Sequence, residues 1–228
     1  VPATASLPVV DTVVFAVGRD RRSAATMPDI HVAGLRAVLD ALPESTGRVV
    51  YVSSTGVYGQ DAGEWVDEET RCEPTGGGGQ ACLSGERLLC AHARGRDAVV
   101  LRMAGLYGPG RVPHAASVSS GTPIAGSADA YLNLIHVEDA AAAVVAAAGA
   151  AGRTYAVSDG HPPTRGEYVE WLATRLGVAP PPFEGGSGRG KRVRNACAVD
   201  ELGLRLRYLS YREGLAALRC PDTGDSPG

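Results

Sequence analysis

Hydroxyl side chains stand at the end of an apolar segment, where they could bind or polarise a substrate oxygen. Residues 48–52 read Arg-Val-Val-Tyr-Val, and Ser53, Ser54 and Thr55 follow directly. An apolar strand that ends in this way presents the hydroxyls at the carboxyl edge of a parallel sheet, where open α/β sheets bind ligands. Thr55 can donate a hydrogen bond to a substrate oxygen, and Tyr58 is a candidate acid/base.

Tyr58 would need help to exchange protons near neutral pH, because an unassisted phenol titrates at about pH 10. Arg102, in a later apolar run, is the nearest candidate cation, and a neighbouring cation lowers the pKa of a phenol. Both residues have a structural alternative. Tyr58 fits a half-buried packing aromatic equally well. Arg102 fits a strand-end arginine that pairs with a surface carboxylate, which we favour.

The elements that must hold these residues alternate between strand and helix. Four apolar runs predict strands buried on both faces of a parallel sheet, at residues 11–18, 49–53, 98–103 and 153–157. Apolar residues at helical spacing over 35–42 lie between the first two runs, and Pro43 with Gly47 ends that helix. Strand, helix, strand is the βαβ unit. We therefore predict an α/β fold with a Rossmann-like, doubly wound parallel sheet.

Further helices and loops are expected around this sheet. Residues 85–93 predict the end of a helix, and the glycines 76–79 before them predict a flexible loop. Asp139 is expected in the first turn of a helix, in a structural role, because a carboxylate complements the helix dipole there. Thr164 and Glu167 have the spacing of a capping box and predict the start of another helix.

Segment 48–59 closely resembles a stretch of the extended short-chain dehydrogenase/reductase family, whose consensus there reads V-x-x-S-S-x-x-V-Y-G. This family contains the NAD(P)-dependent nucleotide-sugar epimerases and dehydratases. Residues 132–139, an apolar stretch ending in His-Val-Glu-Asp, are similar to a second segment of the family. The resemblance places Thr55 on the family's catalytic serine or threonine, and it implies NAD or NADP as the cofactor.

The Tyr-x-x-x-Lys pair of the family has no counterpart in this chain. When the segments are aligned on Gly85 and Glu86, Gly78 stands at the tyrosine position and Cys82 at the lysine position. Glycine has no titratable group, and an ordinary thiol is mostly neutral near neutral pH and cannot supply a fixed cation. The chain therefore resembles the atypical bacterial members of the family that are called epimerase/dehydratase-like.

The glycine motif that binds a pyrophosphate is missing as well. A dinucleotide-binding unit runs its first strand into G-x-x-G-x-x-G, which this sequence does not contain. By the resemblance, the chain opens at the family's fourth strand, which would make the sheet N-terminally incomplete and leave an apolar edge at 13–17. Two explanations are open. We favour a piece of a longer protein over a degenerate homologue that covers this edge with residues 1–10 or a second subunit.

The resemblance also implies which residues contact the cofactor. They follow three of the predicted strands, where the cofactor would approach the edge of the sheet. These residues are Ala16, Val17, Gly18, Ser53, Ser54, Ala104, Gly105 and Leu106. The glycines in segment 104–110 fit a loop that needs their φ angles equally well, so composition alone leaves both interpretations open.

Composition argues against several classes of protein. The chain has 228 residues with 22 basic and 25 acidic side chains, and no basic run points to nucleic acid. No apolar run reaches transmembrane length and the first residues show no basic region followed by an apolar core, so we expect neither membrane insertion nor secretion. Five cysteines without C-x-x-C spacing and dispersed histidines predict neither disulfides nor a metal site. We expect a cytoplasmic protein with a small-molecule substrate and, by analogy with relatives, a homodimer.

We expect the chain to divide into two parts. Residues 9–160 would form a partial NAD(P)-binding Rossmann-like domain, and residues 105–127 and 161–218 would contribute a small C-terminal substrate lobe. The tail 219–228 is expected to be disordered, because it is polar and lies at a terminus.

Three functions are compatible with these features. The first is an NAD(P)-dependent oxidoreductase or epimerase/dehydratase-like enzyme for a hydroxyl, aldehyde or nucleotide-sugar substrate, with Thr55 and Tyr58 as catalytic residues. The second is a catalytically degenerate dinucleotide-binding or regulatory protein, which Gly78 and Cys82 favour. The third is an inactive fragment, which the missing glycine motif favours. The acidic segment 61–68 suggests a substrate-side lid, although a solvated loop is the default interpretation.

Overall fold

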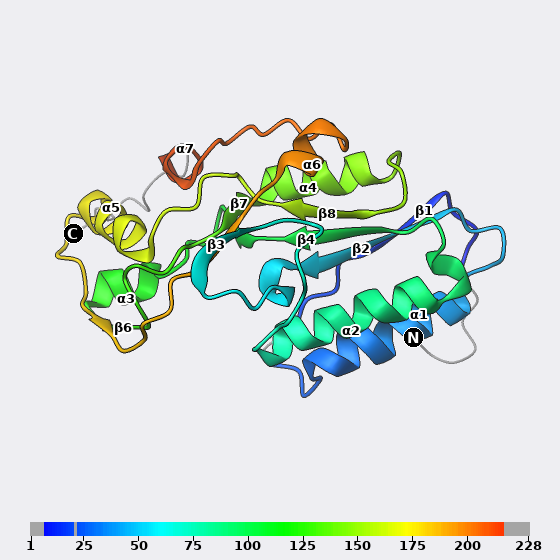
Figure 1. The fold of residues 1–228 in the computed structure, drawn as a ribbon, viewed down its shortest axis with the longest axis horizontal. Coiled ribbons are helices and arrows are strands. Elements are labelled where there is room, and N and C mark those ends of the chain that lie inside the picture. The colour runs from blue at the N-terminus through cyan, green and yellow to red at the C-terminus, as the bar shows by residue number, and fades with distance from the viewer. Residues whose placement is uncertain (1–6, 21, 217–228) are drawn as a thin grey trace, which may run out of the picture.

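A four-stranded parallel sheet forms the centre of the molecule. The computed structural model describes residues 7–20 and 22–216. The strands, in spatial order, are β1 (Thr12–Phe15), β2 (Arg48–Ser54), β4 (Val99–Met103) and β8 (Thr154–Val157). All neighbouring pairs are parallel, so the four carboxyl ends lie at the same edge (Figure 1). The predicted α/β fold with a Rossmann-like parallel sheet is confirmed.

Helices cover both faces of this sheet (Figure 1). On one face lie the π-helical turn η1 (Asp29–Gly34), α1 (Leu35–Ala41), α2 (Gly77–Ala91) and the 3-10 turn η3 (Ala93–Gly95). On the other face lie α4 (Val137–Ala147) and α6 (Ala196–Asp200). Strand side chains alternate between the faces. Val49 and Tyr51 therefore pack with the apolar side of α1 and α2, while Val50 packs with Ala143 of α4.

Helix α2 begins at the glycines that were expected to form a flexible loop. Gly76 is extended, and Gly77, Gly78 and Gly79 form the first turn of the helix. Gly79 is buried because α2 closes on the turn after β2, where a Cβ at this position would overlap the carbonyl oxygen of Gly56. The loop prediction for this segment is wrong, since tertiary packing here requires a residue without a side chain.

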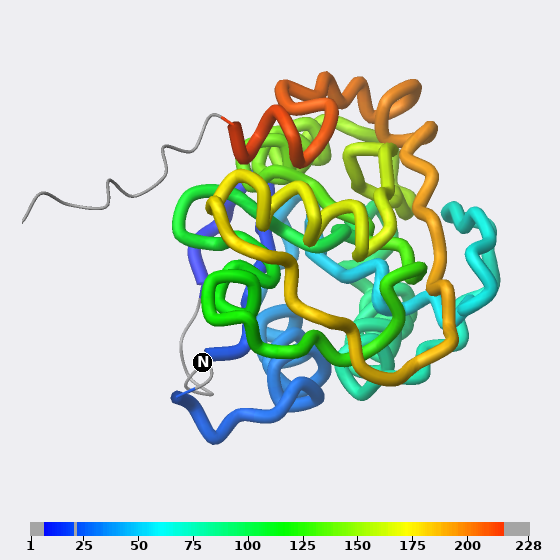
Figure 2. The backbone as a smooth tube through the Cα atoms, turned by 90° about the vertical axis from the view of Figure 1, so that its left-hand side faces the viewer, coloured from blue at the N-terminus to red at the C-terminus, as the bar shows by residue number. Residues whose placement is uncertain are grey.

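A smaller lobe lies beyond the carboxyl ends of the central strands, and Figure 2 shows it in front of the sheet. Its elements are β5 (Gly105–Tyr107), α3 (Ala115–Ser120), β6 (Ile124–Ala125), β7 (Leu134–His136), α5 (Arg165–Leu176), β9 (Phe183–Glu184) and α7 (Tyr211–Ala216). Tyr168, Leu172 and Tyr211 belong to a separate apolar cluster that forms the core of this lobe. The division into two domains with the expected boundaries stays a prediction.

Two local predictions in this lobe have different outcomes. The capping box is confirmed, because Thr164 Oγ1 accepts the Glu167 N–H at 3.2 Å and Glu167 Oε2 accepts the Thr164 N–H at 2.7 Å. The segment 104–110 is not entirely a loop. Gly105 begins strand β5, which pairs with β7, and its N–H donates to the Asn133 carbonyl oxygen at 2.9 Å.

Two segments far apart in the sequence pair beside the lobe. Strands β3 (Ala62–Val66) and β10 (Gly190–Val193) run parallel, with Trp65 opposite Arg192. Asp61 strengthens this pairing, because its Oδ1 accepts the Gly190 N–H at 3.0 Å. The default interpretation of segment 61–68 as a solvated loop is therefore wrong, whereas its role as a lid stays a prediction.

The outer edge of β1 is exposed. Within residues 7–20 and 22–216 no strand pairs with this edge, and Val14 and Val17 expose 45% and 51% of their surface. The two explanations for this edge stay predictions, and the expected disordered tail 219–228 lies outside the described residues. No helix in the described part of the chain has both the length and the apolar character needed to cross a membrane.

Candidate functional site at the carboxyl edge of the sheet

The residues expected to contact a cofactor come together at one edge of the sheet. Strands β1, β2 and β4 are neighbours, so the segments 16–18, 53–54 and 104–106 at their carboxyl ends lie side by side. Residues 16–18 and Gly105 are exposed. Among the described residues, apart from its two chain neighbours, nothing lies within 4 Å of the position a Cβ would take at Gly18. A flat ring could therefore approach the backbone at this edge.

Some polar groups at this edge already have partners inside the protein. Ser53 is 4% exposed, and its hydroxyl donates to the Glu86 carboxylate at 2.6 Å. Ser54 is half-buried, and its hydroxyl oxygen accepts the Gly56 N–H at 3.0 Å. Ala104 is buried and packs in the main core. Ser53 is thus occupied by Glu86 in the interior and supports this edge, whereas Ser54 caps the turn that follows β2.

Thr55 begins this turn, the 3-10 turn η2 (Thr55–Val57). Its side chain is 7% exposed. The turn is fixed from two sides, by the Ser54 cap and by the close approach of Gly79 to Gly56. The position of the Thr55 hydroxyl therefore depends on how α2 packs against this turn.

Tyr58 and Arg102 are in direct contact, as expected for a tyrosine with a neighbouring cation. Arg102 Nη1 donates to the Tyr58 hydroxyl oxygen at 3.0 Å, and the guanidinium carbon lies 5.1 Å from the centre of the ring. Tyr58 is only 2% exposed. Burial raises the pKa of Tyr58 to about 12, and the positive charge of Arg102 offsets only part of this effect. The hydroxyl is therefore protonated at neutral pH.

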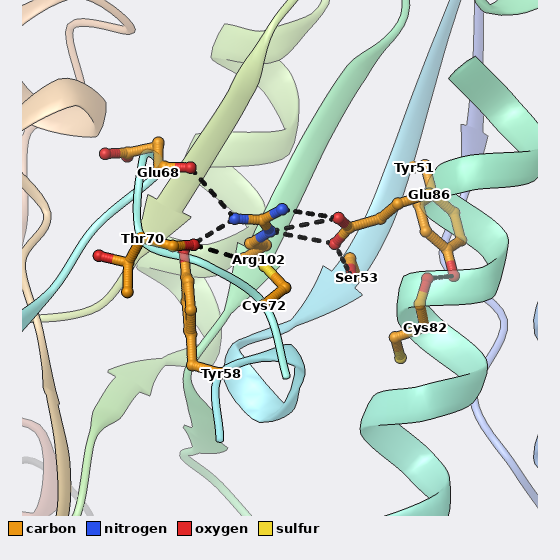
Figure 3. A network of polar contacts seen from close by, with 9 residues as sticks. All are labelled: Tyr51, Ser53, Tyr58, Glu68, Thr70, Cys72, Cys82, Glu86 and Arg102. Atoms are coloured by element: carbon orange, nitrogen blue, oxygen red, sulfur yellow. Dashed lines mark hydrogen bonds and ion pairs between the residues drawn. The ribbon is translucent and has the colours of Figure 1, made fainter. Parts of the chain in front are cut away.

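A buried carboxylate holds Arg102 in place (Figure 3). Arg102 Nη2 donates to Glu86 Oε2 at 2.8 Å, and Nε donates to the two oxygens of the same carboxylate at 3.1 and 3.3 Å. The exposed fractions of Arg102 and Glu86 are 7% and 8%. The ion pair expected for Arg102 exists, but its carboxylate is buried rather than on the surface. Burial alone would lower the pKa of Arg102, yet the bonds to Glu86 raise it overall and keep the guanidinium charged.

The sequence analysis did not place Glu86 or Glu68 in a network with Arg102. Glu68 joins the same network, because its carbonyl oxygen accepts from Arg102 Nη1 at 3.4 Å and its Oε1 accepts the Ala156 N–H at 2.7 Å. One signal for Glu86 was available: it lies four residues after Cys82, on the side of α2 that faces the sheet. An unpaired carboxylate is costly in such a place, so a cation on a neighbouring strand could have been expected.

A hollow of about 660 Å³ lies next to the carboxyl end of β8. Its walls come from β3, β10, the start of α7, and residues 160–163, which follow β8. Trp65, Tyr131 and Arg192 line one side of it. Hollows of this size next to the carboxyl ends of parallel strands hold small-molecule ligands in many α/β proteins.

Two buried polar groups lie in or beside the wall of this hollow without partners. Asp159 is 2% exposed, its Oδ1 accepts the His161 N–H at 3.0 Å, and burial raises its pKa to about 7. Its Oδ2 and the hydroxyl of Tyr211, which lines the hollow, find no hydrogen-bond partner among the described residues. The protonation of Asp159 therefore changes close to neutral pH.

Residues 9–158 match the family model described as the NAD dependent epimerase/dehydratase family. The chain belongs to this family. Among curated proteins it is similar to Protein YeeZ of Escherichia coli strain K12, with 30% identity over 185 residues, covering 79% of this chain and 66% of YeeZ. It is also similar to a dTDP-glucose 4,6-dehydratase of Streptomyces niveus, with 30% identity over 176 residues, covering 71% of this chain and 52% of that enzyme. The chain thus spans between half and two thirds of these relatives.

Solved structures of the family have the same fold. A functionally unknown conserved protein from Silicibacter pomeroyi is 29% identical, with a TM-score of 0.72 over 92% of this chain and 77% of that one. DesIV, a dTDP-glucose 4,6-dehydratase from Streptomyces venezuelae solved with NAD bound, is 26% identical, with a TM-score of 0.74 over 91% of this chain and 71% of that one. The predicted membership of the extended short-chain dehydrogenase/reductase family is confirmed.

The two positions where the family's tyrosine and lysine were expected lie on α2. Gly78 is half-buried, and the Met27 side chain lies 3.8 Å from the position that a Cβ would take there. Cys82 is buried, with its Sγ 3.9 Å from His31 Nε2 and its carbonyl oxygen accepting from the Tyr51 hydroxyl at 3.4 Å. Burial raises the pKa of Cys82 to about 11, so the thiol is neutral and cannot replace a lysine.

Proposed function

We propose that this chain is part of an NAD(P)-dependent oxidoreductase of the epimerase/dehydratase type, which acts on a hydroxyl, aldehyde or nucleotide-sugar substrate. Membership of the family supports the reaction class. The observation that carries the proposal is the edge formed by the ends of β1, β2 and β4, where Thr55 and the segments expected to contact the cofactor come together. The same proposal includes a homodimer in the cytoplasm.

The residues at this edge fit the nicotinamide end of a dinucleotide. Residues 16–18 and Gly105 are exposed and small or apolar, so a planar ring can lie against their backbone. The half-buried Leu106 would supply apolar contact, and the buried Ala104 would support this edge from the core. Bound NAD or NADP would supply hydride transfer. DesIV was solved with NAD, which supports NAD as the cofactor of this chain as well.

Thr55 and Tyr58 are the proposed catalytic residues. The Thr55 hydroxyl would donate a hydrogen bond to the reacting oxygen of the substrate and stabilise the charge that develops on it. Tyr58 would exchange a proton with that oxygen, and the contact with Arg102 supports this role because it favours the phenolate. Its burial opposes the role, since the hydroxyl keeps its proton at neutral pH.

The burial of Tyr58 favours a second function, the binding of a dinucleotide without turnover. A dinucleotide-binding protein without turnover needs no acid/base, and it is compatible with a Tyr58 hydroxyl that serves only to bind Arg102. Gly78 and Cys82 at the family's tyrosine and lysine positions favour it further. Hydride transfer is the property that separates the two functions.

The test is hydride transfer from reduced nicotinamide to a panel of carbonyl and nucleotide-sugar compounds, followed by the loss of nicotinamide absorbance. With turnover, Thr55→Val should lower kcat by about 100-fold, as expected for the loss of a donor to the reacting oxygen. Thr46→Val is the matched control, because Thr46 is a buried threonine before the amino end of β2 whose hydroxyl has no hydrogen-bond partner among the described residues. Cofactor binding without turnover over the whole panel would favour the second function. Unchanged turnover in Tyr58→Phe would contradict the role of Tyr58.

A further inference from the structure

Arg192 projects from β10 into the hollow beside the lobe and is held there in one orientation. The parallel pairing of β10 with β3 places Arg192 directly opposite Trp65. Its Nε donates to the Gly63 carbonyl oxygen at 2.8 Å. Its guanidinium carbon lies 4.9 Å from the ring centres of both Trp65 and Tyr131. Two aromatic rings and one backbone carbonyl therefore fix the plane of the guanidinium group.

The remaining donors of Arg192 have no acceptor within residues 7–20 and 22–216. No hydrogen bond from Nη1 or Nη2 and no ion pair to a carboxylate is present in that part of the chain, although the side chain is half-buried. A guanidinium group has five N–H donors, and only the one on Nε is used here. The four others are available on the side of the hollow.

The carboxylates of the same hollow are engaged elsewhere. Glu167 accepts the N–H and hydroxyl of Thr164 in the capping box at 2.7 and 3.0 Å, and Glu213 accepts the Leu209 N–H at 2.8 Å. Arg212, which also lines the hollow, adds a second positive charge. The hollow therefore contains a charged, oriented donor whose partner is not supplied by the neighbouring carboxylates.

We propose that Arg192 binds an oxyanion of the substrate, either a phosphate or a carboxylate, through two parallel N–H···O bonds in this hollow. The inference rests on the proposed function, because it assigns an anionic group to the substrate of that function. Planar guanidinium groups match both oxyanions in this bidentate way. Because the rings of Trp65 and Tyr131 hold the guanidinium group in place before the ligand binds, little side-chain conformational entropy is lost on binding.

The experiment is calorimetric titration of the whole chain with two probes, uridine diphosphate for the phosphate and glucuronate for the carboxylate. Arg192→Gln should raise the Kd for the probe that binds by about 10- to 100-fold, as expected for losing charge-assisted hydrogen bonds. Arg165→Gln is the matched control. Arg165 is also half-buried, its Nη1 donates to the Ala125 carbonyl oxygen at 2.9 Å and its guanidinium carbon lies 5.5 Å from the Phe183 ring centre, but it does not line the hollow. This control should keep the Kd within about twofold, because the charge that it removes lies outside the hollow.

Arg192→Lys keeps the charge but loses the planar fork, and it provides a second variant if Arg192→Gln does not fold. It should also bind the probe more weakly than the unchanged chain. Equal affinity in the unchanged chain and both Arg192 variants, or no binding of either probe to the unchanged chain, would overturn the inference. Binding of reduced nicotinamide is measured in parallel by fluorescence. If the unchanged chain binds nicotinamide but neither probe, or binds a probe as tightly as both Arg192 variants do, the role of Arg192 is rejected and the proposed function is left standing.

Discussion

Arg102 and Arg192 both pack against aromatic rings, yet their guanidinium groups have different neighbours. Arg102 lies under the sheet edge, where Glu86, Tyr58 and the Glu68 carbonyl oxygen accept its hydrogen bonds. Arg192 lies beside the hollow, where, within the described part of the chain, only the Gly63 carbonyl oxygen accepts one. A buried cation with all its partners inside the protein contributes to folding and positioning. A cation with unused donors at a hollow is available to a ligand.

The largest effect should come from breaking the buried pair on one side. Arg102→Met leaves the Glu86 carboxylate buried without a cation, which should lower the free energy of unfolding by about 3–5 kcal/mol. The double variant Arg102→Met with Glu86→Gln should recover a large part of this loss, because no uncompensated charge remains. Urea denaturation measures both. A loss below about 1 kcal/mol in the single variant would show that the pair is not a folding determinant.

The next effect concerns Asp159 beside the hollow and depends on pH. Because burial raises the pKa of Asp159 to about 7, the folded state binds this proton more tightly than the unfolded state. The contribution of Asp159 to the free energy of unfolding is complete at pH values below its ordinary pKa of about 4, and it is lost as the pH rises to about 7. Asp159→Asn removes this dependence. It should be more stable than the unchanged chain by roughly 2–4 kcal/mol at about pH 8, with little difference at about pH 4.

Thermal unfolding across this pH range checks the prediction for Asp159. His161, Asp139 and Tyr211 also interact with this carboxylate. The test is therefore the difference in stability between the unchanged chain and Asp159→Asn at each pH, not the pH dependence of either protein alone. Parallel curves for the two proteins would contradict the raised pKa.

A smaller effect tests how α2 positions the Thr55 turn and the Arg102 network. Gly79→Ala should destabilise the fold by about 1–3 kcal/mol, because its methyl group would overlap the Gly56 carbonyl oxygen. Gly77→Ala is the matched control in the same helical turn. It has nothing within 4 Å of its Cβ position and should stabilise the fold by about 0.5–1 kcal/mol through helix propensity. Equal effects of the two substitutions in urea denaturation would show that α2 does not touch the turn as described.

The smallest effect is expected at Arg192. Arg192→Gln should lower the free energy of unfolding by about 1 kcal/mol, because it loses the bond to Gly63 and the contacts with two rings, but no buried carboxylate loses its partner. Urea denaturation beside Arg102→Met gives the direct contrast between the two arginines. A loss of several kcal/mol at Arg192 would place both arginines in the same structural class and remove the difference between the regions.

Much of this architecture follows from local patterns. The apolar runs at β1, β2, β4 and β8 and the capping box at Thr164 depend on neighbouring residues only, so the sequence predicts them. The direct contact of Tyr58 with Arg102 was also predictable, because β2 and β4 are adjacent parallel strands whose carboxyl ends meet.

Other features depend on contacts between distant residues, which no local pattern contains. The glycines 76–79 were expected to form a loop, but the fit of Gly79 against Gly56 makes them the start of a helix. The pairing of β3 with β10 joins Trp65 to Arg192 across more than a hundred residues, so the side chains of the hollow were not predictable from either segment. Glu86 escaped prediction for the same reason, since its charge partner lies on another element.

The central claim is that the carboxyl ends of β1, β2 and β4 bind a nicotinamide cofactor. The most direct measurement is a fluorescence titration of NADH into the unchanged chain, into Val17→Glu at that edge, and into Val145→Glu, which places the same charge on another exposed valine, on α4. Saturable binding to the unchanged chain and to Val145→Glu, with a clear loss in Val17→Glu, is the expected result. No binding to the unchanged chain, or equal binding by all three proteins, would contradict the claim.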